Sequence, residues 1–160
     1  MDKPTEDKAN KSGAGHYVFD DDKRKEKQKE IEVFTKAKKL CEYVFQITKK
    51  APKEYRWNLI DKILNASLEL VQILYEANDT YDDRYEKKPN EIHVGSREKK
   101  QREADTKLKL IGWLSMLGNE MQVFNNHQTE YLGKLTLETR QCLWKWIKGV
   151  KEKGAGLDTT

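Results

Sequence analysis

The chain has 160 residues, of which 36% are charged and 36% hydrophobic, and its formal net charge is +4. Only 3 prolines and 9 glycines interrupt it, so turn residues are too few for a β-sandwich and a single helix-rich domain is favoured. No apolar run approaches the roughly 18 residues of a membrane span, and no signal-peptide pattern opens the chain. We therefore expect a cytoplasmic protein with no membrane partner.

The first 22 residues are predicted to be a disordered tail, because they carry too little apolar surface to offset the entropy of ordering. A first helix is predicted over about residues 23–49. Two neighbouring apolar seams at 3,4 spacing mark its buried side. They comprise Val33, Phe34, Ala37, Leu40, Cys41, Val44, Ile47 and Thr48. The opposite face of this helix is rich in lysine.

Pro52 separates the first helix from the second, since proline is excluded from helix interiors but suits a first turn. The second helix is predicted over 53–78, with apolar residues on two adjacent faces. The core face holds Ile60, Ile63, Ser67, Leu70, Leu74 and Ala77. The second face is predicted to be an oligomer interface and holds Trp57, Leu64, Leu68, Val71 and Tyr75. The remaining polar stripe is too narrow for a helix that covers one side of a monomer.

A charged connector over residues 79–97 follows, and its length is typical of functional or mobile segments. The third helix is predicted over 97–124. Its core stripe holds Ala104, Leu108, Ile111, Leu114, Leu117, Met121 and Phe124. A fourth helix is predicted over 128–151, followed by a disordered tail over 152–160. Its inward face holds Leu132, Leu135, Thr139, Cys142, Trp146 and Val150.

Leu137 and Trp144 point away from the core seam of the fourth helix and are predicted to lack a partner within one bundle. They therefore join the predicted oligomer interface. Four helices of this length, two with surplus apolar surface, predict an all-α, antiparallel up-down four-helix bundle that assembles with copies of itself. The domain is expected to span residues 23–151.

Catalytic motifs are absent from the sequence: there is no phosphate-binding glycine loop, no G-x-S-x-G and no H-E-x-x-H. The histidines at 16, 93 and 127 fall in a tail, a connector and a turn. Cys41 and Cys142 have no C-x-x-C partner and are interpreted as small buried hydrophobes in a reducing compartment. We expect no enzyme activity, no metal and no cofactor.

Basic charge is concentrated in the first third of the chain, where residues 23–53 contain 11 Lys or Arg against 4 acidic residues. The basic side chains gather toward the turn between the first two helices, and clusters of this kind suit the successive phosphates of a nucleic acid. They are Lys38, Lys39, Lys49, Lys50, Lys53 and Arg56. A lysine-rich helix face is most often only solvated, so a purely structural role stays open beside nucleic-acid binding.

The stretch from Ala51-Pro52-Lys53 through Arg56 and Leu59 to Glu76-Ala77-Asn78 resembles a known helix-turn-helix. It is that of the accessory variability proteins (Avd) of diversity-generating retroelements, a branch of the four-helix-bundle family that includes proteins encoded in ribosomal RNA intervening sequences. The segments 107–110 and 131–148 resemble the start of that family's third helix and its fourth helix. The resemblance covers about residues 30–151. This chain departs from it in its N-terminal segment, its longer connector, and Lys109 and Ser115, where arginines are expected.

The resemblance implies a non-enzymatic homopentamer that binds the retroelement's reverse transcriptase and template RNA and supports mutagenic cDNA synthesis. With the basic residues of the matched segments, the predicted RNA-binding set is Lys38, Lys39, Lys49, Lys50, Lys53, Arg56, Lys107, Lys109, Arg140 and Lys148. The alternative from another class is a structural oligomeric helical-bundle protein with no nucleic-acid role. Salt-sensitive RNA binding would separate the two.

Overall fold

The computed structural model describes residues 14–83 and 95–155. Within these ranges the protein contains four α-helices and no strand, which confirms the all-helical prediction. The helices are α1 (Ala14–Thr48), α2 (Asp61–Asp79), α3 (Ser96–Glu120) and α4 (Asn126–Ala155). A 3₁₀ turn, η1 (Lys53–Tyr55), and a π-turn, η2 (Arg56–Ile60), lead directly into α2. None of the described helices has an apolar stretch long enough to cross a bilayer.

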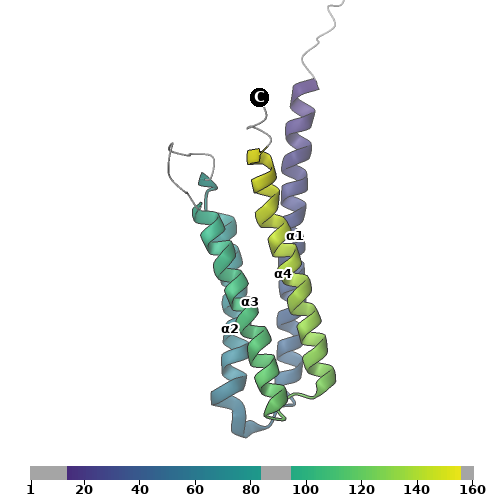
Figure 1. The fold of residues 1–160 in the computed structure, drawn as a ribbon, viewed down its shortest axis with the longest axis vertical. Helices are drawn as coiled ribbons and strands as arrows, with labels where there is room; N and C mark the ends of the chain where they lie inside the picture. Colours follow the sequence, from purple (N-terminus) through teal and green to yellow (C-terminus); the bar gives the residue numbers. More distant parts are fainter. Residues whose placement is uncertain (1–13, 84–94, 156–160) are drawn as a thin grey trace, which may run out of the picture.

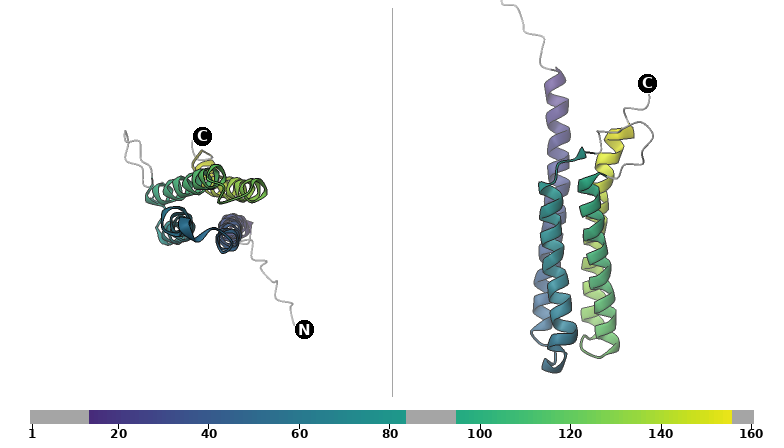
Figure 2. Two further views of the ribbon diagram at one scale, coloured as in Figure 1. Left: turned by 90° about the horizontal axis from the view of Figure 1, so that it is seen from below. Right: turned by 90° about the vertical axis from the view of Figure 1, so that its left-hand side faces the viewer.

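The helices form two layers, α1 with α2 and α3 with α4 (Figure 2). α1 packs against α2 and α4, and α3 packs against the same two helices. The turn between α1 and α2 and the turn between α3 and α4 lie at the same end of the molecule (Figure 1). We call this the turn end; it comprises residues 49–60 and 121–125. α1 projects beyond the other helices at the opposite end (Figure 1).

The core follows the predicted apolar seams. Both seams of α1 are buried apart from the half-buried Phe34, and the predicted core face of α2 is buried at every position. Trp146 and Phe124 are the largest fully buried side chains. The core also takes in residues that the seams did not include, among them Leu59, Ala66, Ile73, Leu143 and Ile147.

Several helix boundaries differ from the prediction, and α2 begins at Asp61 rather than at residue 53 because the 3₁₀ turn and the π-turn precede it. α1 begins at Ala14 rather than at residue 23, so residues 14–22 are helical and not part of a disordered tail. The run KRKEKQKE over residues 23–30 consists of good helix formers, which favours continuation of the helix toward the N-terminus over the disorder that low hydrophobicity suggested. α4 runs to Ala155, so residues 152–155 are helical too. The predictions for residues 1–13, 84–94 and 156–160 lie outside the described residues, and the side chain of Val150, predicted to be core, is not described either.

α3 ends at Glu120 rather than at residue 124. Gln122 has a φ of 60°, the left-handed conformation that reverses the chain after a helix. The amide of Val123 donates to the carbonyl of Gly118 at 2.8 Å, and that of Gln122 donates to Asn119 at 3.0 Å, which is a Schellman motif. Helical spacing therefore no longer applies after residue 120. Phe124 is buried, as predicted, although it lies in the turn and not on α3. Met121, which was also predicted to be core, is 49% exposed.

Candidate nucleic-acid interface

The turn between α1 and α2 is built by a short run of local hydrogen bonds. The Thr48 hydroxyl donates to the carbonyl of Val44 at 2.8 Å, and the Ala51 amide donates to the carbonyl of Thr48 at 3.2 Å. Pro52, which has no amide hydrogen, ends this pattern, and its carbonyl accepts from Tyr55 to close the 3₁₀ turn. Because the chain reverses here without burying its polar side chains, residues 49, 50 and 52–54 are all exposed.

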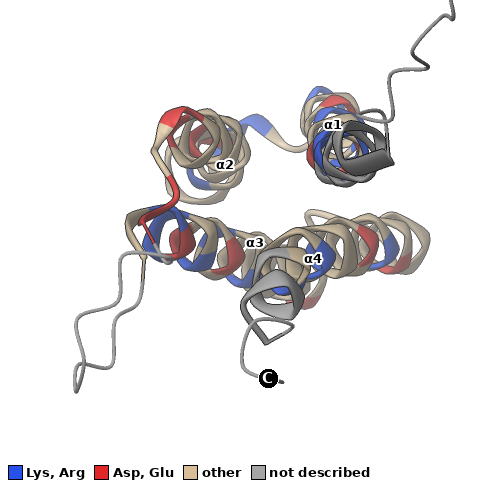
Figure 3. Cartoon of the chain, turned by 90° about the horizontal axis from the view of Figure 1, so that it is seen from above, with Lys and Arg blue, Asp and Glu red and all other residues tan. Residues whose placement is uncertain are grey.

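Four cations are exposed at this turn: Lys49, Lys50, Lys53 and Arg56, which we call the turn cluster. None of the four forms an ion pair or a side-chain hydrogen bond within the described part of the chain. Basic residues colour the connection between α1 and α2 in Figure 3. The cluster therefore offers unpaired positive charge, the requirement for binding successive phosphates.

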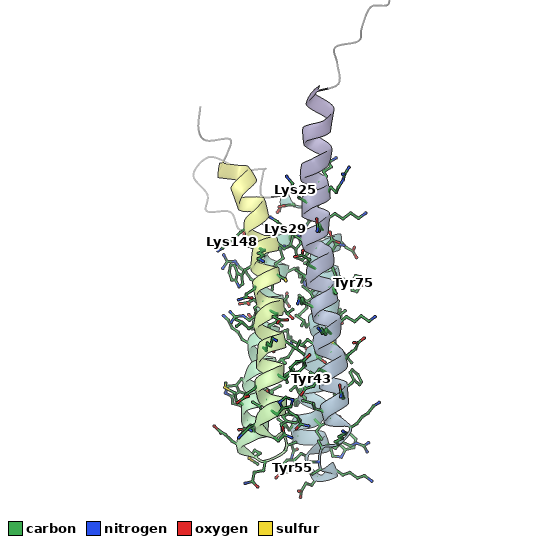
Figure 4. The ribbon with its side chains drawn as sticks, turned by 90° about the vertical axis from the view of Figure 1, so that its right-hand side faces the viewer. Lys25, Lys29, Tyr43, Tyr55, Tyr75 and Lys148 are labelled. Atoms are coloured by element: carbon green, nitrogen blue, oxygen red, sulfur yellow. The ribbon has the colours of Figure 1, made fainter. Side chains whose placement is uncertain are left out.

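The backbone beneath the turn cluster is anchored to the core. Leu59 and Ile60 are 4% and 7% exposed, and the half-buried Tyr55 packs against the core at the turn end (Figure 4). Trp57, which lies between these anchors, is 74% exposed. Core packing on both sides of Trp57 therefore anchors the backbone that carries the Trp57 indole and the neighbouring cations of the turn cluster.

Three other predicted RNA-binding residues are held by carboxylates. The Lys107 ammonium pairs with Glu69 of α2. Arg140 donates to Asp105 at 2.7 Å, and the Lys109 ammonium lies 3.5 Å from the same carboxylate. These cations are less available to phosphate than the turn cluster, since binding would first have to break an ion pair.

The remaining predicted cations are dispersed. Lys38, whose ammonium lies 3.8 Å from Glu42, shares a groove of about 500 Å³ with Lys49, Lys50 and Phe45 and so adjoins the turn cluster. Lys39 lines a separate groove with Tyr43 and Tyr131. Lys148 is exposed but lies toward the opposite end from Tyr55 (Figure 4). The structure thus brings together Lys38, Lys49, Lys50, Lys53 and Arg56 only.

The predicted oligomer interface is partly exposed. Leu68, Tyr75 and Leu137 are 51%, 56% and 53% exposed, whereas Leu64 and Val71 are half-buried against the core.

Trp144 differs from the prediction, because it has partners within the chain. Its indole nitrogen donates to Asp105 at 3.3 Å, and the guanidinium of Arg102 lies 5.8 Å from its ring centroid. Pairing across α3 and α4 occupies this side chain, which helical spacing along α4 alone could not show.

Sequence reasoning missed several of the exposed apolar side chains among the described residues. Leu110, Trp113 and Met116 lie on α3 and are 39%, 56% and 56% exposed, and Phe45 lies on α1 and is 41% exposed. The 3-residue spacing of the three on α3, outside the predicted core stripe, was the available signal.

Cys41 is buried, and its thiol donates to the carbonyl of Ser67 at 3.1 Å. Burial raises the pKa of this thiol, and the hydrogen bond to Ser67 offsets that effect only in part. Cys142 is half-buried. Among the described residues no three His, Cys, Asp or Glu side chains are grouped so that they could hold a metal ion.

Comparison of the chain with protein-family models, with curated proteins and with solved structures returns no match.

Proposed function

We propose that this protein is a non-enzymatic, cytoplasmic accessory protein of a diversity-generating retroelement. In this role it binds template RNA and the reverse transcriptase and supports mutagenic cDNA synthesis. The proposal rests on the resemblance of residues 30–151 to the accessory variability proteins and on the turn cluster. The turn cluster is the single structural observation that carries the RNA-binding part of the proposal.

The turn cluster supports RNA binding because its four cations are exposed, adjacent and unpaired within the described residues. Contacts of this kind neutralise phosphates without reading bases, and each one releases bound counterions. Binding of this origin weakens steeply as salt rises. A surface that supports it also attracts acidic or RNA-bound faces of a polymerase, which is how we propose that the reverse transcriptase docks.

We further propose an antiparallel up-down bundle that assembles into a homopentameric ring. Support comes from exposed apolar side chains in both layers: Leu68 and Tyr75 on α2, and Trp113, Met116 and Leu137 on α3 and α4. Soluble monomers rarely expose this much large apolar surface. Two different patches that meet between neighbouring copies make head-to-tail contacts, and such contacts can close into rings. A ring would repeat the turn cluster and bind a long RNA through many weak contacts.

The test is a charge reversal of Lys53 and Arg56 together. We expect RNA affinity to fall for every sequence tested. The slope of log K against log salt should become shallower by about 0.7–0.9 for each phosphate that the variant no longer neutralises. Helical content and oligomer size are expected to stay unchanged, because both side chains are exposed and unpaired within the described residues. Fluorescence anisotropy over a salt series measures the slope, and circular dichroism and sedimentation measure the fold and the assembly.

The matched control reverses Lys99 and Lys145, two exposed lysines that lie on α3 and α4 outside the turn end. It makes the same change in net charge and is expected to alter RNA affinity much less. Equal effects in the two variants would mean that net charge alone attracts RNA. An unchanged affinity and slope in the Lys53 and Arg56 variant would contradict the proposed role of the turn cluster.

A structural assembly protein without a nucleic-acid partner is the second candidate. The ion pairs of Lys107 with Glu69 and of Arg140 with Asp105 favour it, because they place predicted RNA-binding residues in bonds between helices. In this case the wild-type protein would bind no RNA at low salt.

A further inference from the structure

The exposed indole of Trp57 has no place in the core and is set apart from the apolar face of α2. The π-turn over Arg56–Ile60 inserts one extra residue into the helix that leads to Asp61, whose amide donates to the Arg56 carbonyl. One residue of an α-helix corresponds to a rotation of about 100°. The regular α-helical spacing that would place Trp57, inside the π-turn, on the stripe formed by Leu64, Leu68, Val71 and Tyr75 is therefore interrupted.

Trp57 is the most exposed of these side chains: it is 74% exposed, Leu68 and Tyr75 are 51% and 56% exposed, and Leu64 is half-buried against the core. In an uninterrupted α-helix Trp57 and Leu64 would lie on one face, because seven residues make nearly two full turns. The π-turn breaks this spacing, and Arg56 of the turn cluster directly precedes Trp57 in the chain.

We infer that Trp57 is a stacking platform for an unpaired base and that the turn cluster selects single-stranded RNA. This inference rests on the RNA binding proposed above and adds the class of nucleic acid. An indole among lysines and arginines is the arrangement that binds single strands, because bases stack on the ring while cations contact the flanking phosphates. In duplex RNA the bases are already stacked within the helix, so the indole has no base to receive.

The local structure suits this role, because the indole is carried on an anchored turn. Tyr55 on one side of Trp57 and Leu59 and Ile60 on the other pack into the bundle. Arg56 is its immediate neighbour in sequence, and Lys53 lies four residues earlier, at the start of the 3₁₀ turn. Little ordering of the backbone is therefore required when RNA binds, which favours affinity.

The experiment compares three ligands with the full-length protein: a single-stranded oligouridine, an RNA duplex of the same length, and inorganic polyphosphate, which carries charge without bases. Trp57→Ala is expected to weaken binding of the oligouridine by roughly 5- to 150-fold, the range for removal of one base stack. Binding of the duplex and of polyphosphate, and the salt slope for all three ligands, are expected to stay unchanged. Trp57→Phe keeps an aromatic ring and should retain most of the affinity for the oligouridine.

Tyr81→Ala is the matched control, since Tyr81 is also an aromatic side chain that is 74% exposed, but it follows α2 at the end away from the turn end. It should bind the oligouridine as wild type does. If Trp57→Ala binds the oligouridine as tightly as wild type while reversal of Lys53 and Arg56 weakens it, the stacking role is wrong and RNA binding stands. If Trp57→Ala breaks the oligomer in sedimentation velocity, the indole is a subunit contact and the inference is overturned. If the wild-type protein binds neither the oligouridine nor the duplex, both the proposed function and this inference are wrong.

Discussion

Asp105 is a buried carboxylate of α3 that interacts with three side chains at the contact between α3 and α4. Its side chain is 6% exposed and receives Arg140 at 2.7 Å, the Trp144 indole at 3.3 Å and Lys109 at 3.5 Å. Burial alone would raise the pKa of Asp105, but the cations of Arg140 and Lys109 hold it below its ordinary value. One carboxylate thus contacts three side chains of α3 and α4.

The lowered pKa makes Asp105 a source of acid sensitivity. A carboxyl whose pKa is lower in the folded state stabilises the fold at pH values above its unfolded pKa of about 3.9, and this stabilisation is lost as the pH falls toward the folded pKa. We expect Asp105→Asn to lower the free energy of unfolding at pH 7 by about 1–3 kcal/mol. The difference from wild type should shrink as the pH falls from about 5 to 3.

Urea denaturation at a series of pH values measures this difference. Glu138→Gln is the control, because Glu138 pairs with Lys36 at 3.1 Å but both side chains are about one-third exposed. An exposed pair contributes only about 0–1 kcal/mol, so its effect at pH 7 should be smaller. A constant difference between Asp105→Asn and wild type across the pH range would contradict the role given to this carboxylate.

At the scale of the elements, the turn between α3 and α4 contains two positions that favour glycine for different reasons. Gln122 holds a φ of 60°, which glycine adopts without strain. Gly118 lies beneath the buried Phe124 ring, and a Cβ added to it would meet that ring at 2.4 Å. Gln122→Gly is therefore expected to stabilise the protein by about 0.5–1 kcal/mol. Gly118→Ala is expected to destabilise it by about 1–3 kcal/mol through overpacking.

Gly133→Ala separates this packing effect from helix propensity. Gly133 lies inside α4 with no atom within 4 Å of an added Cβ, so the substitution should stabilise the protein by about 0.5–1 kcal/mol. Thermal or urea unfolding of the three variants tests the ranking. If Gly118→Ala proved as stable as wild type, the packing of the Phe124 ring would not require the absence of a side chain at position 118.

At the scale of the whole molecule, the exposed apolar side chains predict an assembly. Sedimentation equilibrium should give a mass well above the 18.8 kDa of one chain. Leu68→Glu and Leu137→Glu introduce a charge at positions 51% and 53% exposed, one on α2 and one on α4. Each variant should no longer form the full assembly but should keep its helical content, because neither side chain is part of the core.

Mixing the two variants tests whether the contacts are head to tail. In a head-to-tail contact the intact α4 patch of Leu68→Glu meets the intact α2 patch of Leu137→Glu, so the mixture should form a complex that neither variant forms alone. In a two-fold contact each patch meets its own copy, and mixing would create nothing new. A wild-type monomer at micromolar concentration would remove the assembly altogether.

The sequence by itself determined the helices and most of the core. The 3.6-residue period of the apolar positions is a local property, so it located Ile63, Leu70 and Leu108 on buried faces without knowledge of the packing. The first turn could likewise be predicted from Pro52, because the effect of a proline on the backbone is confined to its neighbours. The basic character of the α1–α2 turn could also be predicted from residues close together in the chain.

Only the tertiary structure decided which cations are unpaired. Lys107 and Arg140 have the same charge as Lys53, yet their carboxylate partners, Glu69 and Asp105, lie 38 and 35 residues away in sequence. Ion pairs of this kind form when helices from distant segments pack, so no local pattern reveals them. The π-turn at Trp57 and the pairing of Trp144 with Asp105 could not be predicted from the sequence for a related reason. Helical spacing assumes an uninterrupted helix and carries no information about the helix packed beside it.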